Sequence, residues 1–502
     1  MLDLVKTELD VMQTGQTQSA NVLLLIPGKK TSQKNTVRDL VYGCWCNGRR
    51  IGGMQMPPLN HLFVATTLQE DGHHCTFVDA QLEYEAYEHL ERENFAGLDF
   101  LVLISSTNSF RDDLASTKYI KSKNPSIKVI FCGSHPTLMP KITLEEEAID
   151  YIVLREPELS TRDLIRRIVS HKSLADLDGC GYRYNGEIVI NPPQKFFDMN
   201  ELPVPNWTLL PRNLDYFNPV VKRMPYATMQ TSRGCPAKCI YCSSPFFYGN
   251  QIRVKTAENV LKEIRYLVGL GYKEIFFRDE TFTAFKARNI EICKAIIEEK
   301  IDVTWIANGR VDMIDVEQAD YMKRAGCHML KFGVESGNDD LLVNIKKGAS
   351  VQQCREAFRV CHEVGLDTHS HIIFGSPGET LETIGETIKF AQEIDTTTAS
   401  FGIMTPYAGT EHFDMVVKRH PEIKDGSEIT MDTLHTTAYY TEAVCDLKHE
   451  QLQRMVSKAY RTFYFRPSYL LKWLGKINSM DELFRLVLAG TNIFTFGISG
   501  KK

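Results

Sequence analysis

Two long stretches of the chain alternate short apolar runs with helical patterns, which restricts each of them to an α/β fold. In the first stretch, helical patterns at 59–71, 111–123 and 160–170 separate the apolar runs. The expected strands are 21–27, 76–80, 98–105, 127–132 and 150–154. Strands that alternate with helices indicate a parallel sheet covered on both faces. Residues 20–175 are therefore predicted to form a Rossmann-like domain, which binds ligands beyond the carboxyl ends of its strands.

The second alternating stretch begins after a region that breaks the pattern. Asn185-Gly186 lies between alternating residues and predicts a tight hairpin, and the many prolines that follow predict a linker over 176–225. Six strands are then expected, at 226–231, 274–278, 303–308, 328–334, 367–375 and 400–405. Such strand–helix units predict a partial (β/α)6 TIM-type barrel over 226–415, with its chemistry at the carboxyl ends of the strands. Residues 1–19 are predicted to be an N-terminal extension, and residues 416–502 a mostly helical C-terminal region.

Composition excludes several classes of protein. The 502 residues are too many for one ordinary core, and the net charge of -5 gives no nucleic-acid footprint. The first 15 residues lack the pattern of a signal peptide, and the uncharged stretch 486–500 is too short and too polar to span a bilayer. We therefore expect a cytoplasmic protein, whose 13 cysteines are reduced thiols or metal ligands rather than disulfides.

The most specific motif is SRGCPAKCIYCS at 232–243, directly after the first expected barrel strand. It places Cys235, Cys239 and Cys242 in CxxxCxxC spacing, and closely spaced thiolates on one loop can hold a single iron–sulfur cluster. Three thiolates on a four-iron cubane leave one iron without a protein ligand, so an amine and a carboxylate can chelate it. A structural zinc site is the alternative, but such sites use four protein ligands, and no clear second pair follows. The position at a strand end, after Arg-Gly, argues against a chance grouping.

With this motif, the barrel region resembles the radical S-adenosylmethionine (SAM) superfamily. Matching segments end the later strands, at 277–282, 308–312, 332–337, 374–379 and 404–410. The resemblance implies that Asp279 or Glu280 accepts hydrogen bonds from the SAM ammonium group, and that Arg310 is offered at the third strand end. It also implies that Glu335 contacts the ribose hydroxyls and that Gly375 lies in the loop beside the adenine. Each short motif alone is weak, because it also suits an ordinary turn, but together they are in the right order and spacing.

Residues 20–225 resemble the subgroup of these enzymes that carry an N-terminal cobalamin-binding domain. Matching segments lie at 56–59, 105–107, 132–137, 155–158, 184–189 and 198–203. The resemblance implies cobalamin contacts from Ser105, Ser106, Thr107, Gly133, Ser134, His135 and Glu156. Many such domains carry a cobalt-ligating His after the first strand, whereas the loop here, PGKKTSQKN at 27–35, has none. Two interpretations stay open: cobalamin binds without a protein imidazole, or the domain has kept its fold and lost its cofactor.

Three further features are each open to two interpretations. His135 follows a glycine turn, and a turn histidine is favoured over a cobalt ligand. Cys44 and Cys46 have no partner pair, so buried thiols or a loop near the cofactor are favoured over a metal site. His369 and His371 share one strand face; that face can be the barrel interior, but core histidines are the safer interpretation.

The resemblance also implies a reaction. A reduced [4Fe-4S] cluster would cleave SAM to a 5′-deoxyadenosyl radical, with electrons from a flavodoxin or ferredoxin. Cobalamin would then carry a methyl group to an unactivated carbon of a small or lipid-like biosynthetic substrate. The alternative is a non-methylating cyclisation or oxidation of a tetrapyrrole, hopanoid or antibiotic scaffold, a branch that the segment YFRPSY at 464–469 resembles. Such a substrate would allow peripheral contact with a membrane. A non-catalytic cobalamin or SAM sensor is the third hypothesis, against which the intact cluster motif argues.

Overall fold

The computed structural model describes residues 19–28, 54–80, 94–107, 109–210, 216–423, 440–474 and 479–499, together with residues 90 and 477. Cys44, Cys46 and most of the loop at 27–35 lie outside the described residues, so the expectations for them stay predictions. Among the described residues, no helix is both long enough and apolar enough to cross a membrane.

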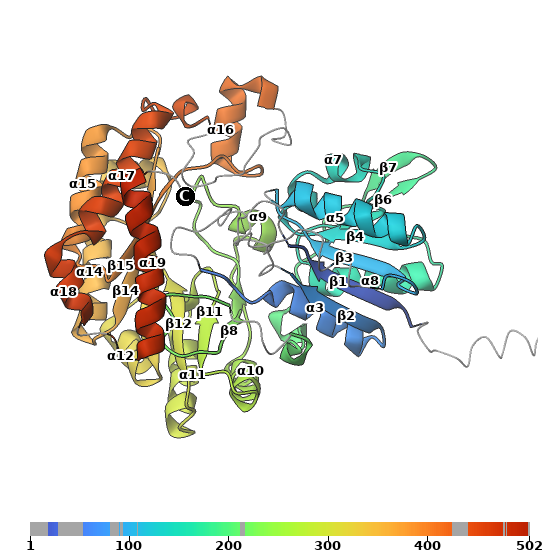
Figure 1. Cartoon of the computed structure of the whole chain (residues 1–502), viewed down its shortest axis with the longest axis horizontal. Coiled ribbons are helices and arrows are strands. Elements are labelled where there is room, and N and C mark those ends of the chain that lie inside the picture. Colours follow the sequence, from blue (N-terminus) through green and yellow to red (C-terminus); the bar gives the residue numbers. More distant parts are fainter. Residues whose placement is uncertain are drawn as a thin grey trace, which may run out of the picture.

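A seven-stranded sheet with the order β2-β1-β3-β4-β5-β6-β7 forms the first α/β unit (Figure 1). Its parallel strands are β1 (Asn21–Ile26), β2 (His74–Asp79), β3 (Phe100–Ile104), β4 (Lys128–Cys132) and β5 (Tyr151–Val153). The helices are α3 (Leu59–Glu70), α5 (Phe110–Lys123), α6 (Ser134–Leu138), α7 (Pro140–Glu145) and α8 (Pro157–Val169). Alternate residues of β1 enter two separate apolar cores: Val22 and Leu24 pack in one, Leu23 and Leu25 in the other. The predicted parallel sheet with two covered faces is thereby confirmed.

The hairpin predicted around Asn185-Gly186 forms, but it extends this sheet instead of standing in the linker. Its strands are β6 (Cys180–Tyr184) and β7 (Glu187–Ile190), and β6 pairs antiparallel with β5. Asn185 and Gly186 have φ angles of 50° and 83°, which a two-residue turn of this kind requires. The first α/β unit therefore continues to Ile190, and only the residues after it connect to the barrel.

The second unit is a six-stranded parallel sheet with the order β15-β14-β13-β12-β11-β8, as predicted for a partial barrel. Its strands are β8 (Tyr226–Met229), β11 (Glu274–Phe277), β12 (Thr304–Gly309), β13 (Cys327–Glu335), β14 (Asp367–Phe374) and β15 (Thr398–Ile403). The intervening helices are α10 (Ala257–Gly269), α11 (Lys286–Glu298), α12 (Val316–Arg324), α13 (Asp339–Asn344), α14 (Val351–Glu363) and α15 (Leu381–Glu393). Amphipathic helices with one buried face, such as α14, cover the outside of these strands.

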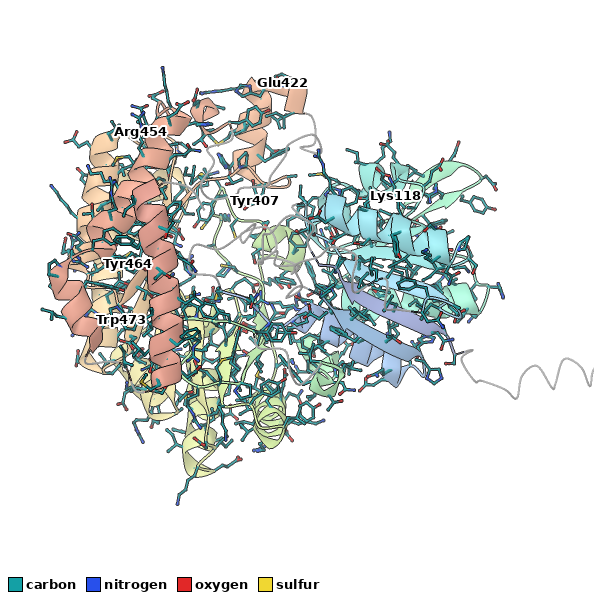
Figure 2. The ribbon with its side chains drawn as sticks, viewed as in Figure 1. Lys118, Tyr407, Glu422, Arg454, Tyr464 and Trp473 are labelled. Carbon is teal, nitrogen blue, oxygen red and sulfur yellow. The ribbon has the colours of Figure 1, made fainter. Side chains whose placement is uncertain are left out.

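Tyrosine side chains close the free edge of β15. The C-terminal helices are α16 (Glu411–Arg419), α17 (His449–Tyr464), α18 (Pro467–Leu474) and α19 (Met480–Ser499). The Tyr464 hydroxyl accepts from the Ala399 N–H at 2.9 Å and donates to the Ala399 carbonyl at 2.6 Å. Tyr460 accepts from the Phe401 N–H, and Tyr469 donates to the Thr397 carbonyl. Because an edge strand otherwise presents unpaired backbone groups, these hydroxyls fix the C-terminal helices to the barrel. Figure 2 labels Tyr464 at its place on α17.

Candidate active site

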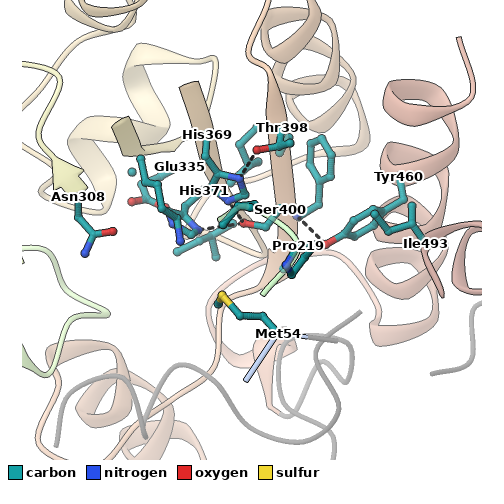
Figure 3. A pocket seen from close by; sticks show the side chains of 18 of the residues that line it. Met54, Pro219, Asn308, Glu335, His369, His371, Thr398, Ser400, Tyr460 and Ile493 are labelled. Carbon is teal, nitrogen blue, oxygen red and sulfur yellow. Dashed lines mark hydrogen bonds between the residues drawn. The ribbon is translucent and has the colours of Figure 1, made fainter. Parts of the chain in front are cut away.

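A cavity of about 1120 Å³ connects the ends of the barrel strands to the C-terminal helices. Residues that follow the strands line one side of it, among them Cys235, Thr281, Arg310 and Met404. Figure 3 shows the neighbouring wall, where β14 and β15 face α17 and α19. The carboxyl ends of barrel strands are where the sequence predicts the chemistry.

Cys235, Cys239 and Cys242 all line this cavity, on the loop between β9 (Ser232–Arg233) and α9 (Ser244–Tyr248). The loop turns tightly, since the Cys242 N–H donates to the Cys239 carbonyl at 3.1 Å. Gly234 has a φ of 99°, and a Cβ there would lie 2.3 Å from the Gln251 carbonyl oxygen. Any side chain at this position would therefore displace the loop that carries the thiols.

The three thiols fit a cluster better than a single metal ion. Among the described residues, no group of three His, Cys, Asp or Glu side chains converges closely enough to hold one ion. A multi-iron cluster does not need such convergence, because each thiolate binds a different iron. Burial raises the pKa of Cys239, while nearby Lys347 and Arg310 act in the opposite direction. Positive charge at this point of the cavity, from those cations or from iron, favours the thiolate form that ligation needs.

Only one of the two acidic candidates after β11 reaches the cavity. Glu280 lines it, next to Thr281. Asp279 is fully buried behind it and accepts three hydrogen bonds, from the Thr231 N–H, the Thr231 hydroxyl and the Ser232 hydroxyl, at 2.5 to 2.7 Å. Its carboxylate therefore ties β11 to the start of the cysteine loop and does not line the cavity.

Arg310 and Glu335 also line the cavity, as the sequence predicts for strand ends. Glu335 adopts a φ of 64°, an unusual conformation for a residue with a side chain, and its carboxylate accepts from the Lys347 ammonium at 2.8 Å. Arg310 is oriented by two hydrogen bonds to Asp312, at 2.9 and 3.0 Å. Lys347 was not among the predicted residues, because a lysine 12 positions after Glu335 carries no motif.

Gly375 does not line the cavity. Its N–H donates to Glu379, and a Cβ at this position would lie 2.5 Å from the Thr441 side chain. It therefore allows the C-terminal region to approach the end of β14 closely.

The predicted cobalamin contacts lie together at the carboxyl edge of the first sheet. Ser105, Ser106 and Thr107 follow β3, and Gly133, Ser134 and His135 follow the adjacent β4. The two loops touch, since the His135 N–H donates to the Ser105 carbonyl at 3.1 Å. The Ser105 hydroxyl donates to Asp113 at 2.8 Å, so this side chain is engaged within the domain.

This edge keeps features that suit a large polar ligand. The Ser134 hydroxyl is buried and has no hydrogen-bond partner among the described residues. Gly133 has a φ of 101°, and a Cβ there would lie 2.6 Å from the Ser105 carbonyl oxygen. The His135 ring stacks on Phe110 with centroids 3.8 Å apart.

Glu156 joins the two units through an ion pair. Its carboxylate pairs with Arg233 at 2.9 Å and with Arg253 at 2.7 Å, and the Glu156 and Arg233 side chains are completely buried. The Glu158 carboxylate, two residues further along the chain, pairs with the same guanidinium. The Glu156 carboxylate is thus bound by two arginines of the barrel unit. Arg233 was not predicted either, although it stands in the cysteine motif two residues before Cys235.

His369 and His371 line the cavity rather than the apolar core. Their rings lie 4.5 Å apart (Figure 3). The safer interpretation as core histidines is therefore wrong, and the interior face considered for them is correct.

Comparison with known proteins agrees with both units. A family model described as the radical SAM superfamily matches residues 229–391, and a model described as a B12 binding domain matches residues 52–165. An uncharacterized methyltransferase of Pyrococcus horikoshii, PH0819, is 32% identical over 433 residues, which cover 84% of this chain and 91% of that protein. The anaerobic magnesium-protoporphyrin IX monomethyl ester cyclase of Synechocystis is 29% identical over 63% of this chain and 64% of its own length.

Solved structures share the fold. The radical SAM methyltransferase TsrM of Kitasatospora setae, with cobalamin and a [4Fe-4S] cluster bound, superposes with a TM-score of 0.64 at 18% identity, over 80% of this chain and 78% of its own. The cobalamin-dependent radical enzyme OxsB, with aqua-cobalamin and SAM bound, gives 0.67 at 16% identity, over 97% of this chain and 74% of its own. The chain belongs to the family of radical SAM enzymes that carry a cobalamin-binding domain, and whose cofactors are an iron–sulfur cluster, SAM and cobalamin.

Proposed function

We propose that this enzyme methylates an unactivated carbon of an apolar, lipid-like substrate. The observation that carries the proposal is the cavity, in which the three cysteines share a space with an apolar wall from α17 to α19. The cavity of about 1120 Å³ extends from the cysteine loop to this wall, so it can hold the cluster and SAM at one end and an apolar substrate at the other.

The wall opposite the cysteine loop suits a hydrocarbon. Its residues include Trp473, Leu483, Leu486, Ile493 and Phe494. Leu471 and Val487 line the cavity and are also 68% and 55% exposed, so they mark a rim where an apolar molecule can enter. Further exposed apolar side chains follow along α19, at Phe484 and Ile498. An apolar rim of this kind supports entry of the substrate from a lipid surface.

The residues around the cysteine loop support binding and orientation. Cys235, Cys239 and Cys242 would hold the cluster, and Glu280 and Glu335 would accept hydrogen bonds from the ammonium and ribose groups of SAM. When bound, the cluster supplies the electron that cleaves SAM and cobalamin supplies the methyl group. Gly375 and Glu156 act through packing and ion pairing in this proposal, and not through contact with a cofactor.

The first unit supports cobalamin binding at the carboxyl ends of β3 and β4. The segment before α3 enters the cavity with Met54 and Met56, which brings the first unit to the barrel site. The helix α9, directly after Cys242, packs through Phe247 and Tyr248 into the same apolar core as Ile104 and Cys132 at the ends of β3 and β4. The stacked His135 supports cobalamin binding without this imidazole as a cobalt ligand. A flavodoxin or ferredoxin as electron donor stays a prediction.

Ring closure is the second candidate, favoured by the cyclases among the relatives. An apolar cavity with a radical source suits either reaction, because both begin by removing hydrogen from an unactivated carbon.

The test is an anaerobic reaction of the reconstituted enzyme with cobalamin, CD₃-labelled SAM, a low-potential reductant and a lipid extract of the source cells. We expect 5′-deoxyadenosine, and labelled methyl groups in the lipid fraction. A lipid product that has lost two hydrogens and gained no label would instead establish ring closure or oxidation. Cys239→Ala should abolish both products, with Cys361→Ala, a buried core thiol, as the matched control that keeps them. Label confined to water-soluble products would contradict a lipid-like substrate.

A further inference from the structure

Polar side chains form a ladder across the barrel wall, in a cavity that is otherwise apolar there. In the register of the sheet, Lys331 on β13 is paired with His369 on β14, and His369 with Thr398 on β15. Two residues further along, His371 is paired with Ser400. All five side chains line the cavity. In a closed barrel, side chains at such positions pack against one another in layers that fill the interior. Here they border the cavity instead.

The alternation of burial along β14 shows that the two imidazoles lie on the face of the strand that borders the cavity. His369, His371 and Ile373 are partly accessible, whereas Thr368, Ser370, Ile372 and Phe374 are buried. Successive side chains of a strand point to opposite faces, so both imidazoles share the cavity face. Purely structural residues on this face would be apolar like Ile373, because a buried imidazole needs hydrogen-bond partners.

Hydrogen bonds hold the two imidazoles in place. His369 Nδ1 lies 2.7 Å from the Thr398 hydroxyl, and its Nε2 lies 3.3 Å from the Ser400 hydroxyl. His371 Nδ1 lies 2.9 Å from the same Ser400 oxygen (Figure 3). Because Ser400 has one hydroxyl hydrogen, it donates to one imidazole and accepts from the other. The ladder is therefore connected, and its donors are ordered before a ligand arrives.

Lys331 supplies the basic group of this wall, and its Nζ lies 4.9 Å from the centroid of the Phe276 ring. Burial, together with His371 and Lys331, lowers the pKa of His369 well below its ordinary value. Among the described residues that line the cavity, the carboxylates are Glu280 and Glu335, and Glu335 pairs with Lys347. Asp367, two residues before His369, does not line the cavity and pairs with Lys222 at 3.6 Å.

We propose that Lys331 and His371, with His369 as a positioning residue that orients Ser400 and Thr398, form a subsite for an anionic oxygen group, a carboxylate or a phosphate, at one end of the substrate. An ammonium with imidazole and hydroxyl donors is the set that recognises such oxygens, and the interaction is strong where water is excluded. The inference rests on the proposed function, since it needs an apolar substrate in the same cavity. The subsite determines which end of that substrate enters first, and so which carbon faces the cysteine loop.

The test measures binding, without turnover, of three probes with the same chain: palmitate, hexadecyl phosphate and hexadecanol. The full-length protein is titrated with each, and quenching of tryptophan fluorescence is followed because Trp473 lines the cavity. We expect an anionic probe to bind about tenfold more tightly than hexadecanol, as one charge-assisted contact provides. The stronger of the two anions identifies the group as carboxylate or phosphate.

Lys331→Met should remove this preference and leave hexadecanol binding unchanged, and Lys331→Arg should retain most of it. Lys294→Met removes an exposed lysine of α11 as the matched control and should change nothing. If Lys331→Met does not fold, as judged by thermal unfolding, His371→Gln serves instead and should weaken only the anionic probes. Equal affinities for palmitate, phosphate and alcohol in the unsubstituted protein would overturn the subsite and leave the apolar cavity standing. Failure of all three probes to bind would overturn the lipid-like substrate as well.

Discussion

The guanidinium of Arg233 and the carboxylate of Glu156 lie 2.9 Å apart, and neither side chain is exposed. Arg233 belongs to the barrel unit, two residues before the first cluster cysteine, and Glu156 precedes α8 of the first unit. The ring of Tyr248 covers the guanidinium, with its centroid at 5.1 Å. A buried pair of this kind fixes geometry, because each charge is costly without the other.

Replacing Arg233 with methionine should destabilise the protein by about 3 to 5 kcal/mol, since Glu156 and Glu158 then lose a shared buried partner. The cysteine loop should loosen with it, so less iron should be retained after reconstitution. Denaturant unfolding and iron content per chain measure the two effects. Arg359→Met, which removes exposed ion pairs with Glu356 and Glu363, is the control and should leave the stability nearly unchanged, because water screens such pairs. Unchanged stability in Arg233→Met would contradict a structural ion pair.

Glu280→Gln should affect SAM binding and Asp279→Asn should affect stability, although the two residues are neighbours. Glu280 lines the cavity, so the amide should weaken SAM binding by about tenfold, with little change in stability. Asp279 accepts three hydrogen bonds away from the cavity, so the amide should cost about 1 to 3 kcal/mol of stability. Calorimetric titration with SAM and thermal unfolding separate the outcomes. Loss of SAM affinity confined to Asp279→Asn would reverse the assignment.

Glu379 should make the stability depend on pH between about 4.5 and 7. Burial raises its pKa from 4.5 to about 7, although the N–H groups of Gly375 and Ser376 act in the opposite direction. The folded protein therefore holds this proton more tightly than the unfolded chain. Its contribution is complete below pH 4.5 and is lost as the pH rises to about 7. Unfolding followed from pH 5 to pH 8 should show this loss, and Glu379→Gln should remove it; identical profiles would contradict the raised pKa.

Tyr464→Phe should weaken the attachment of α17 to β15. The ring stays, but the N–H and carbonyl of Ala399 both lose their partner, which costs about 1 to 3 kcal/mol. Amide hydrogen exchange at Ala399 should accelerate relative to the other residues of β15. Tyr184→Phe, at a tyrosine that is 64% exposed, is the control for which we expect no change. Equal exchange rates would show that the edge does not depend on this hydroxyl.

Local patterns were enough to predict the strands and the cysteine loop. The apolar run of β1 and the six barrel strands are visible in a few consecutive residues, and so is the spacing of Cys235, Cys239 and Cys242. Local patterns do not predict the direction of a side chain at a strand end, because that direction depends on the neighbouring strands. Asp279 and Glu280 are neighbours in one motif, and Asp279 turns away from the cavity where the Thr231 N–H and the hydroxyls of Thr231 and Ser232 bind its carboxylate.

Contacts between distant residues could not be predicted in this way. Glu156 and Arg233 are 77 positions apart, and no periodicity connects them. The sequence did not predict that the ladder at His369 borders a cavity, since a histidine on a strand face can contact either a packed core or open space. That choice depends on α17 to α19, whose residues stand about 100 positions later in the chain.

The tyrosine attachment of the last strand has a consequence for how such enzymes diversify. The barrel edge is completed by three hydroxyl groups on residues 460, 464 and 469, and no further strand is needed there. The helices α17 to α19, which form the apolar wall of the cavity, are thus held to the barrel by side chains, through these hydroxyls and through the shared apolar core, and they lie far in sequence from the cysteine loop. Under the proposed function, the residues that select the substrate can therefore change between relatives while the strands and the cysteine loop stay the same.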